Sequence, residues 1–368
     1  MSSKAPIATP TEASRVNTVA RAADELRRGQ PVVVTSGDTA LLIMAAESAN
    51  TATLSQFDAL KPTDSFCLLT HHRAASLKIA PEDWKTVRID RTAWMGAGDL
   101  VALADPTLDL KNPLKGPFKR VLSDAPTVDE AAIMLLKIAR LLPTAIAAPI
   151  DAAPADVLVV WADAITRYDS ALTDDLKEVA RANVPLVDAA KTQLVSFRSR
   201  YGGPEHMAIV IGEPRTSQSV LTRIHSECFT GDLLGSLKCD CGEQLRGAIA
   251  TISAEGGGVL LYMAQEGRGI GLISKLKAYS LQEDGYDTVD ANLRLGFEVD
   301  ERAFAPAANM LKALGYHSIR LMTNNPLKVA GLEVSGITVT ERVEHSFPAN
   351  PHNEQYLAIK KSKTGHIL

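Results

Sequence analysis

The chain has 368 residues, which at roughly 150 residues per domain predicts two domains, or three. Hydrophobic residues make up 46% and charged residues 22% of the sequence, so most of the chain is expected to fold. The 39 lysines and arginines against 43 aspartates and glutamates give a net charge of −4, which argues against nucleic-acid binding through bulk positive charge. An anionic ligand must therefore be bound by a few placed basic groups.

The sequence also argues against a membrane protein. Residues 1–18 lack the apolar core of a signal peptide. No stretch reaches the ~18 uninterrupted apolar residues that a membrane-spanning helix needs. We expect a cytoplasmic protein without membrane or nucleic-acid partners.

In the first half of the chain, hydrophobic periodicity and turn residues predict helices and short strands in alternation. Strands are expected at 32–34 and 157–160, and helices at 19–28, 41–48, 128–142 and 172–182. The basic stretch 195–204 ends in glycine and proline and is predicted to be a hinge. We place the domain boundary there, which gives one domain at 1–200 and a second at 201–368.

In the second half, strands and helices alternate more regularly. Strands are expected at 208–211, 219–224, 259–263 and 319–322, and helices at 241–254, 273–282, 307–314 and from Pro326 onward. This alternation is typical of a sheet flanked by helices. The predicted fold class is α/β, with two mixed α/β domains, the second of them a sheet flanked by helices.

Three of the four cysteines, Cys228, Cys239 and Cys241, lie within 14 residues of one another. Such a group of soft thiolates suits Zn²⁺. No fourth cysteine lies nearby in the sequence, which favours a catalytic zinc with one open position, although His225 could complete a structural tetrahedron and free thiols remain possible. Three thiolates leave a zinc site at a formal charge of −1, so nearby cationic groups are expected.

Two further segments have the composition of anion-binding loops. The run 265–271, Gln-Glu-Gly-Arg-Gly-Ile-Gly, lies between a predicted strand and a predicted helix, where glycines let the backbone approach a phosphate. The run 323–328, Thr-Asn-Asn-Pro-Leu-Lys, lies at another such junction. The alternative for the first run is a tight turn with a charged rim, and the alternative for the second is ordinary helix capping by asparagine.

The carboxylate and guanidinium of Asp300 and Arg302 are a pair suited to phosphoryl groups. The alternative is that Asp300 caps a short first turn of the next helix.

Together these motifs resemble the GTP cyclohydrolase II family. The matching segments are 223–245, 265–292, 295–304, 323–328 and 350–357, and the resemblance extends over about 212–368. It implies that Cys228, Cys239 and Cys241 bind one Zn²⁺ per subunit. The residues that it implies for GTP binding are Arg223, Ile224, His225, Ser226, Glu227, Gln244, Glu266, Gly267, Arg268, Thr288, Thr323 and Lys328.

The resemblance also implies three catalytic residues. Asp300 would be a proton acceptor, Arg302 a nucleophile at the α-phosphate, and Tyr279 an assisting residue at the ring. A guanidinium is in effect always protonated and is a poor nucleophile, so Arg302 is alternatively a clamp on the α-phosphate that Asp300 orients.

The activity that the resemblance implies is hydrolysis of GTP in riboflavin biosynthesis. The imidazole ring opens, C8 leaves as formate, and pyrophosphate is expelled with the help of Mg²⁺. The product is 2,5-diamino-6-ribosylamino-4(3H)-pyrimidinone 5′-phosphate. Either Glu227 or Gln244 could read the guanine edge, and the enzyme is expected to be a homodimer. The alternatives are a related enzyme for another nucleotide, a GTP-binding regulator without catalysis, and a bifunctional enzyme.

The first domain resembles a decayed 3,4-dihydroxy-2-butanone-4-phosphate synthase, with traces at 26–34, 42–47 and 186–200. That family carries an acidic metal-binding run between such segments. Here the interval 35–41 has a single carboxylate, Asp38. Without carboxylate ligands a Mg²⁺-assisted reaction has no metal site, so this domain is expected to be catalytically silent. The adjacent His71 and His72 are expected in a solvated loop rather than in a metal site.

Overall fold

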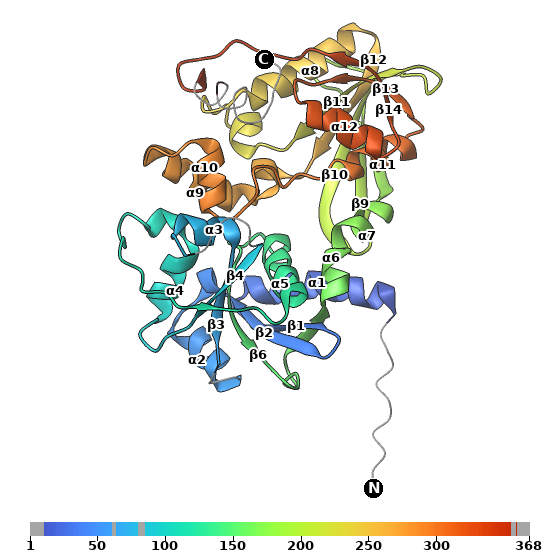
Figure 1. The fold of residues 1–368 in the computed structure, drawn as a ribbon. Helices are drawn as coiled ribbons and strands as arrows, with labels where there is room; N and C mark the ends of the chain where they lie inside the picture. The colour runs from blue at the N-terminus through green and yellow to red at the C-terminus, as the bar shows by residue number, and fades with distance from the viewer. Residues whose placement is uncertain (1–10, 61–63, 80–84, 355–357, 359–368) are drawn as a thin grey trace. The chain divides into compact units, whose positions relative to one another are not determined.

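The structure is a computed structural model that describes residues 11–60, 64–79, 85–354 and 358. It divides into two compact units (Figure 1). The first unit extends to Ala171 and includes Arg294–Gly296, and the second begins at Leu172. In the described residues each unit has a seven-stranded sheet with helices, which confirms the expected fold class of two mixed α/β domains. No helix among the described residues combines the length and apolarity needed to cross a membrane.

The sheet of the first unit is mainly antiparallel, with only β1 and β7 paired in parallel among its described strands. Its order is β5-β4-β3-β6-β2-β1-β7. The strands are β1 (Val32–Ser36), β2 (Thr39–Ala45), β3 (Phe66–Thr70), β4 (Thr86–Asp90), β5 (Arg120–Val121), β6 (Thr144–Pro149) and β7 (Leu158–Trp161). The helices are α1 (Glu12–Arg27), α2 (Thr51–Leu60), α3 (His71–Ser76), α4 (Ala97–Ala104), α5 (Pro126–Ile138) and α6 (Ala162–Thr166).

Three sequence predictions for the first half are wrong. The helix expected at 41–48 is strand β2 followed by a 3₁₀ turn at Ala46–Ser48. Its residues 41–46 are all buried, and a short, fully buried apolar run has no periodicity that separates strand from helix. The helix expected at 172–182 ends at Asp174 as α7 (Tyr168–Asp174) and gives way to a strand at Lys177. His71 and His72 do not lie in a loop, because they open α3, which Thr70 caps.

The sheet of the second unit is mixed, in the order β14-β13-β11-β12-β10-β9-β8. Strands β12, β11, β13 and β14 run parallel, and the β8–β9–β10 meander joins β12 in antiparallel pairing. The strands are β8 (Lys177–Asn183), β9 (Thr192–Ser199), β10 (Gly202–Gly212), β11 (Val220–Ser226), β12 (Gly257–Met263), β13 (Ser318–Met322) and β14 (Thr338–Val343). The helices are α8 (Cys241–Ala254), α9 (Gly271–Glu283), α10 (Thr288–Arg294), α11 (Ala305–Ala313) and α12 (Pro326–Val334).

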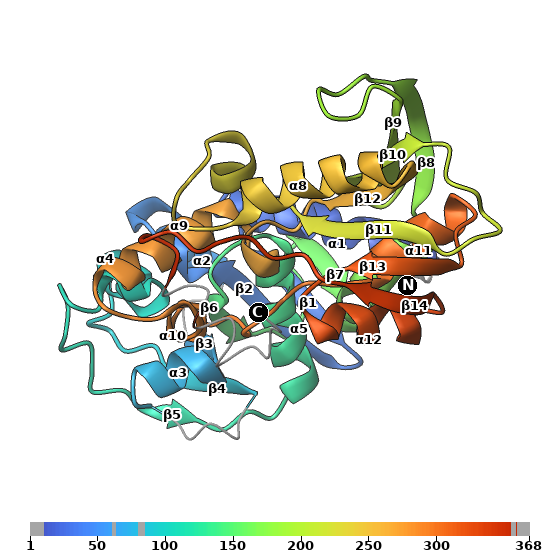
Figure 2. The same cartoon turned by 90° about the horizontal axis from the view of Figure 1, so that it is seen from above.

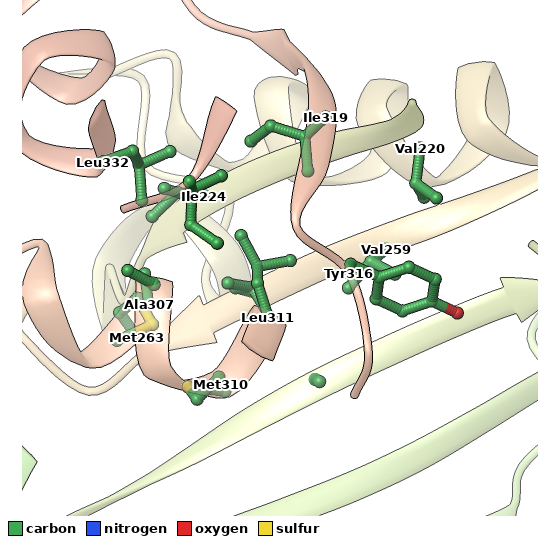
Figure 3. Close-up of a cluster of buried hydrophobic side chains, with 14 of the residues drawn as sticks. Val220, Ile224, Val259, Met263, Ala307, Met310, Leu311, Tyr316, Ile319 and Leu332 are labelled. Carbon is green, nitrogen blue, oxygen red and sulfur yellow. The ribbon is translucent and has the colours of Figure 1, made fainter. Parts of the chain in front are cut away.

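Helices cover both faces of this second sheet (Figure 2). Strand β12 illustrates the need for helices on both faces. Successive side chains of a strand point to opposite faces of the sheet. Leu260 packs with Ile252 of α8, whereas Val259 and Leu261 pack in the cluster that contains Leu311 of α11 (Figure 3). A strand that is apolar on both faces needs such a covering on each side.

The predicted hinge at 195–204 is part of this sheet. Strands β9 and β10 pair antiparallel, with Val195 opposite Ala208, so residue 200 lies in the turn between two paired strands. Gly202 and Gly203 have positive φ angles of 90° and 79°, which explains the glycines without a domain linker. The second compact unit of the structure begins at Leu172.

Candidate active site

One pocket lies where three parallel strands of the second sheet end. Strands β11, β12 and β13 end at Ser226, Met263 and Met322, and each is followed by one of the motifs found in the sequence. The carboxyl ends of parallel strands meet at one edge of a sheet, which is where α/β proteins bind ligands. The loops after these strands all contribute residues to the pocket.

Most of the predicted site residues line this pocket. These are Arg223, His225, Ser226, Glu227, Cys228, Cys239, Cys241, Gln244, Glu266, Gly267, Arg268, Tyr279, Thr288, Arg302, Thr323 and Lys328. Two predicted residues are not among the lining residues. The side chain of Ile224 lies in the hydrophobic core. Asp300 contacts Arg302, which itself lines the pocket.

The three cysteines form a cluster whose sulfur atoms lie within 4.8 Å of one another. The Sγ atoms of Cys228 and Cys239 are 3.8 Å apart. A tetrahedral zinc with Zn–S bonds of about 2.3 Å places two sulfur ligands about 3.8 Å apart, so the cluster fits that ion. Cys228 and Cys239 are buried, and all three thiols are free of disulfides.

Gly231 packs directly against the three cysteines. A Cβ atom there would lie 2.8 Å from Cys239 Sγ, 2.9 Å from Cys241 Cβ and 3.1 Å from Cys228 Sγ. The Gly231 amide donates a hydrogen bond to Cys228 Sγ at 3.3 Å. Only glycine leaves room for the three sulfurs to approach one another in this way.

His225 is not a fourth member of the cluster. Its Nε2 lies 3.0 and 3.1 Å from the two carboxylate oxygens of Asp232, which also accept hydrogen bonds from Tyr262 and from the Cys228 amide. The group of potential metal ligands at this place consists of Cys228, Cys239 and Cys241, and His225 is not part of it. The geometry therefore does not support a structural zinc closed by His225.

The glycine-rich run after β12 is held in left-handed backbone conformations. Gly267 and Arg268 have φ angles of 64° and 60°, and a non-glycine residue in this region is uncommon. Gly269 packs against the backbone of Glu301, where a Cβ would lie 2.7 Å from the carbonyl oxygen. The strained turn places Arg268 on the pocket, with its Nη1 3.3 Å from the Val299 carbonyl.

The loop after β13 both caps a helix and places a cationic side chain at the pocket. Asn325 caps α12 by accepting a hydrogen bond from the Leu327 amide at 2.9 Å, as the capping alternative expects. Lys328 is buried and donates a hydrogen bond to the Ile224 carbonyl at 2.8 Å while lining the pocket. The loop therefore supplies both a helix cap and a cation.

Asp300 does not cap the next helix. Helix α11 begins at Ala305, with Phe304 at the capping position. Asp300 instead binds Arg302 through both carboxylate oxygens, at 2.8 and 2.6 Å. Burial alone would raise the pKa of Asp300, but the Arg302 guanidinium outweighs it and lowers the pKa below its usual range.

Arg223 and Gln244, which both line the pocket, are hydrogen-bonded to each other. The Arg223 guanidinium donates to the Gln244 side-chain oxygen and, at 2.8 Å, to the Met322 carbonyl. The Gln244 amide nitrogen donates to Asp240. Burial lowers the pKa of Arg223 to about 10, which still leaves it charged at neutral pH.

Several further residues line the pocket that were not predicted from the sequence, among them Lys238, Lys275, Gln282, Asn292 and His345. Lys275, Tyr279 and Gln282 follow one another at helical spacing on α9. That spacing was a usable signal, because residues three and four apart share a helix face. No such spacing points to His345, because it lies in a segment after β14. The side chain of Asn324 holds that segment by hydrogen bonds to the backbone carbonyl and amide of His345.

Comparisons with known proteins show the family to which the chain belongs. The family profile described as GTP cyclohydrolase II matches residues 177–344. A GTP cyclohydrolase-2 of Azospirillum brasilense is 44% identical over 369 residues, which cover 98% of this chain and 96% of that protein. The chain belongs to the GTP cyclohydrolase II family.

One further relative matches about half of the chain, and one solved structure matches most of it. The riboflavin biosynthesis protein RibBA of Bacillus velezensis is 52% identical over 182 residues, which are 49% of this chain and 46% of that protein. A solved structure of RibBX, a two-domain 3,4-dihydroxy-2-butanone 4-phosphate synthase from A. baumannii, covers 89% of this chain and 99% of its own, at 15% identity and a TM-score of 0.32. At that score the structural match supports no conclusion.

Proposed function

We propose that this enzyme hydrolyses GTP to 2,5-diamino-6-ribosylamino-4(3H)-pyrimidinone 5′-phosphate, formate and pyrophosphate, the first step of riboflavin biosynthesis. The observation that carries the proposal is the convergence of the three-cysteine cluster with several cationic side chains in one pocket. A triphosphate and a ring that undergoes hydrolysis require both elements in the same place. Family membership makes GTP the nucleotide to test first.

In this proposal Cys228, Cys239 and Cys241 hold one zinc ion. The fit of the sulfur separation, together with the space that Gly231 leaves, supports that assignment. When bound, zinc supplies Lewis acidity, which permits hydrolytic chemistry near neutral pH. The protein contributes the orientation of the substrate and the exclusion of other reactions.

The triphosphate is bound, in this proposal, by Arg268, Arg302 and Lys328, and Mg²⁺, when bound with the substrate, would supply further positive charge. All three side chains line the pocket. Positive charges around a transferring phosphoryl group stabilise the charge that develops there. Arg302 acts as a clamp at the α-phosphate and Asp300 as the residue that orients it, because both Asp300 oxygens are occupied by Arg302.

For the base, we propose Glu227 as the group that reads the guanine edge. Gln244 is less suited, since its side-chain oxygen binds Arg223 and its amide nitrogen binds Asp240. Tyr279 would donate a hydrogen bond to the reacting ring. Burial raises its pKa to about 12, so the phenol keeps its proton at neutral pH.

We also propose that the first unit has no synthase activity. Strands β1 and β2 pair directly from Ser36 opposite Thr39, so Gly37 and Asp38 form the entire connection. A connection of two residues has no room for an acidic metal-binding run. Ribulose 5-phosphate incubated with the enzyme and Mg²⁺ should therefore remain unconsumed.

We also propose that the enzyme is a homodimer. Several large apolar side chains near the cysteine cluster are exposed, namely Phe229, Leu233, Leu234, Leu237, Ile273 and Leu276. Association of two copies would remove such a surface from water. Light scattering after size-exclusion chromatography distinguishes a dimer from a monomer.

The experiment that tests the proposed reaction is incubation of the purified enzyme with GTP and Mg²⁺, followed by mass spectrometry of the nucleotide product. Formation of the diaminopyrimidinone 5′-phosphate supports the proposal, and its loss in Cys239→Ser places the chemistry at the cysteine cluster. A formamide product that keeps C8 would mean that the reaction stops early. Bound GTP that is recovered unchanged from zinc-loaded enzyme would instead indicate a regulator.

A further inference from the structure

Lys275 of α9 is the cation that contacts the cysteine cluster. Its Nζ lies 3.1 Å from Cys228 Sγ, 3.1 Å from Thr230 Oγ1 and 2.8 Å from Glu266 Oε1. The side chain is only 12% exposed. An ammonium has three N–H donors, and three acceptors lie within hydrogen-bonding distance of this one.

The charges around this ammonium explain why it lies there. Three thiolates and one Zn²⁺ sum to −1, and the neighbouring Glu266 carboxylate, 8% exposed, adds another negative charge. Buried charge of one sign is costly unless a counter-charge lies close by. Lys275 touches both the thiolate ligand and the carboxylate, so one ammonium offsets two anionic groups.

We propose that Lys275 is a positioning residue of the cysteine site, which fixes Cys228 through an N–H···S hydrogen bond and thereby sets the affinity of the site for zinc. The inference rests on the proposed use of the cluster as a zinc site. Partners of this kind orient metal ligands, and their removal typically weakens metal affinity or activity by about 10–100-fold.

A competing explanation is that Lys275 serves only as the partner of Glu266. Glu266 has backbone donors of its own, because two amides lie 2.6 and 3.1 Å from its two oxygens. Removal of Lys275 therefore leaves Glu266 partly satisfied. Apart from the other cysteines of the cluster, Cys228 Sγ would keep two weak contacts among the described residues, with the Gly231 amide at 3.3 Å and the Thr230 hydroxyl at 3.7 Å. The two explanations predict different zinc affinities when Glu266 is neutralised as well.

The test is a measurement of zinc affinity by competition with a chromophoric chelator, in the full-length enzyme and without GTP. We expect Lys275→Met to weaken zinc binding by about 10–100-fold, and Lys275→Arg, which keeps the charge, to retain most of the affinity. The weakening should persist in the double variant with Glu266→Gln. Lys277→Met is the matched control, since Lys277 lies on the same helix but is not a lining residue of the pocket.

A spectroscopic measurement keeps the proposal testable if Lys275→Met does not fold. Cobalt substituted for zinc gives thiolate-to-metal absorption bands that respond to hydrogen bonds on sulfur. Lys275→Arg and Lys275→Gln should shift these bands, and Lys277→Met should not. Wild-type zinc affinity in Lys275→Met, or affinity restored by Glu266→Gln, would overturn the proposal.

These outcomes are independent of the proposed reaction, because no measurement here uses GTP. An enzyme whose zinc affinity depends on Lys275 but which leaves GTP intact would contradict the proposed function and leave this inference standing.

Discussion

Asp300 and Arg302 form a two-pronged ion pair at the edge of the pocket, with Nε 2.8 Å from Oδ1 and Nη2 2.6 Å from Oδ2. The remaining guanidinium nitrogen, Nη1, lies 3.5 Å from Ser226 Oγ. A fork-to-fork pair fixes the plane of a guanidinium as well as its position. The pair thus presents one defined face of Arg302 to the ligand, and this relationship underlies the first prediction.

Asp300→Asn should impair pyrophosphate release more than GTP binding. An asparagine has one acceptor oxygen and cannot hold both guanidinium nitrogens, so Arg302 loses its orientation. We expect kcat to fall by about 100-fold, the size of effect that a misplaced positioning group produces, with a much smaller change in KM. Steady-state assays with pyrophosphate detection measure both. Equal losses in kcat and in GTP affinity would contradict a positioning role.

Gly231→Ala should abolish tight zinc binding without unfolding the enzyme. The new methyl group would collide with Cys239 Sγ at 2.8 Å and Cys228 Sγ at 3.1 Å, which spreads the cluster. Overpacking of this kind typically costs about 1–3 kcal/mol. Zinc content by elemental analysis is the readout.

Gly235→Ala is the matched control for that substitution. Gly235 lies in the same loop at a φ of 66°, and a Cβ there would meet nothing within 4 Å. The control therefore carries backbone strain but no collision with sulfur, and it should keep its zinc. Zinc loss in Gly235→Ala alone would refute the steric explanation.

Asp232→Asn should weaken catalysis through His225. The carboxylate binds His225 Nε2, while the buried Nδ1 has no hydrogen-bond partner among the residues that the structure describes. Loss of a hydrogen bond to a charged group costs about 1.5–3 kcal/mol, so kcat/KM is expected to fall by about 10–100-fold. Nitrogen NMR of the imidazole should show a changed tautomer. An unchanged tautomer with lower activity would mean that Asp232 acts only on the cysteine loop.

The stability of the enzyme should fall as the pH drops from 6.5 toward 4, partly because of His345. Burial lowers the pKa of this imidazole to about 4, so in that range the unfolded chain binds a proton that the folded chain does not. The contribution is on the order of 1–3 kcal/mol. His345→Gln should flatten the decline in denaturant unfolding at pH 5 relative to pH 7. An identical pH dependence in the variant would contradict the assignment.

The second half of the chain was predictable because its local signals agree with its tertiary structure. The helix expected at 241–254 is α8 with the same bounds, and the parallel strands that end at the pocket all lie where their apolar runs indicated. Residues 41–48 were not predictable in this way, since burial on every side removes periodicity. The contacts of Lys275 with Cys228 and Glu266 were also not predictable from the sequence, because the fold brings these separate segments together.

The most direct test of the whole account is the stoichiometry of formate and pyrophosphate released from GTP by zinc-loaded enzyme, measured beside chelator-treated enzyme. We expect equal amounts of formate and pyrophosphate from the zinc-loaded enzyme and neither product from the chelated one. Release of both products after complete zinc removal, or GTP that stays intact on fully zinc-loaded enzyme, would contradict it.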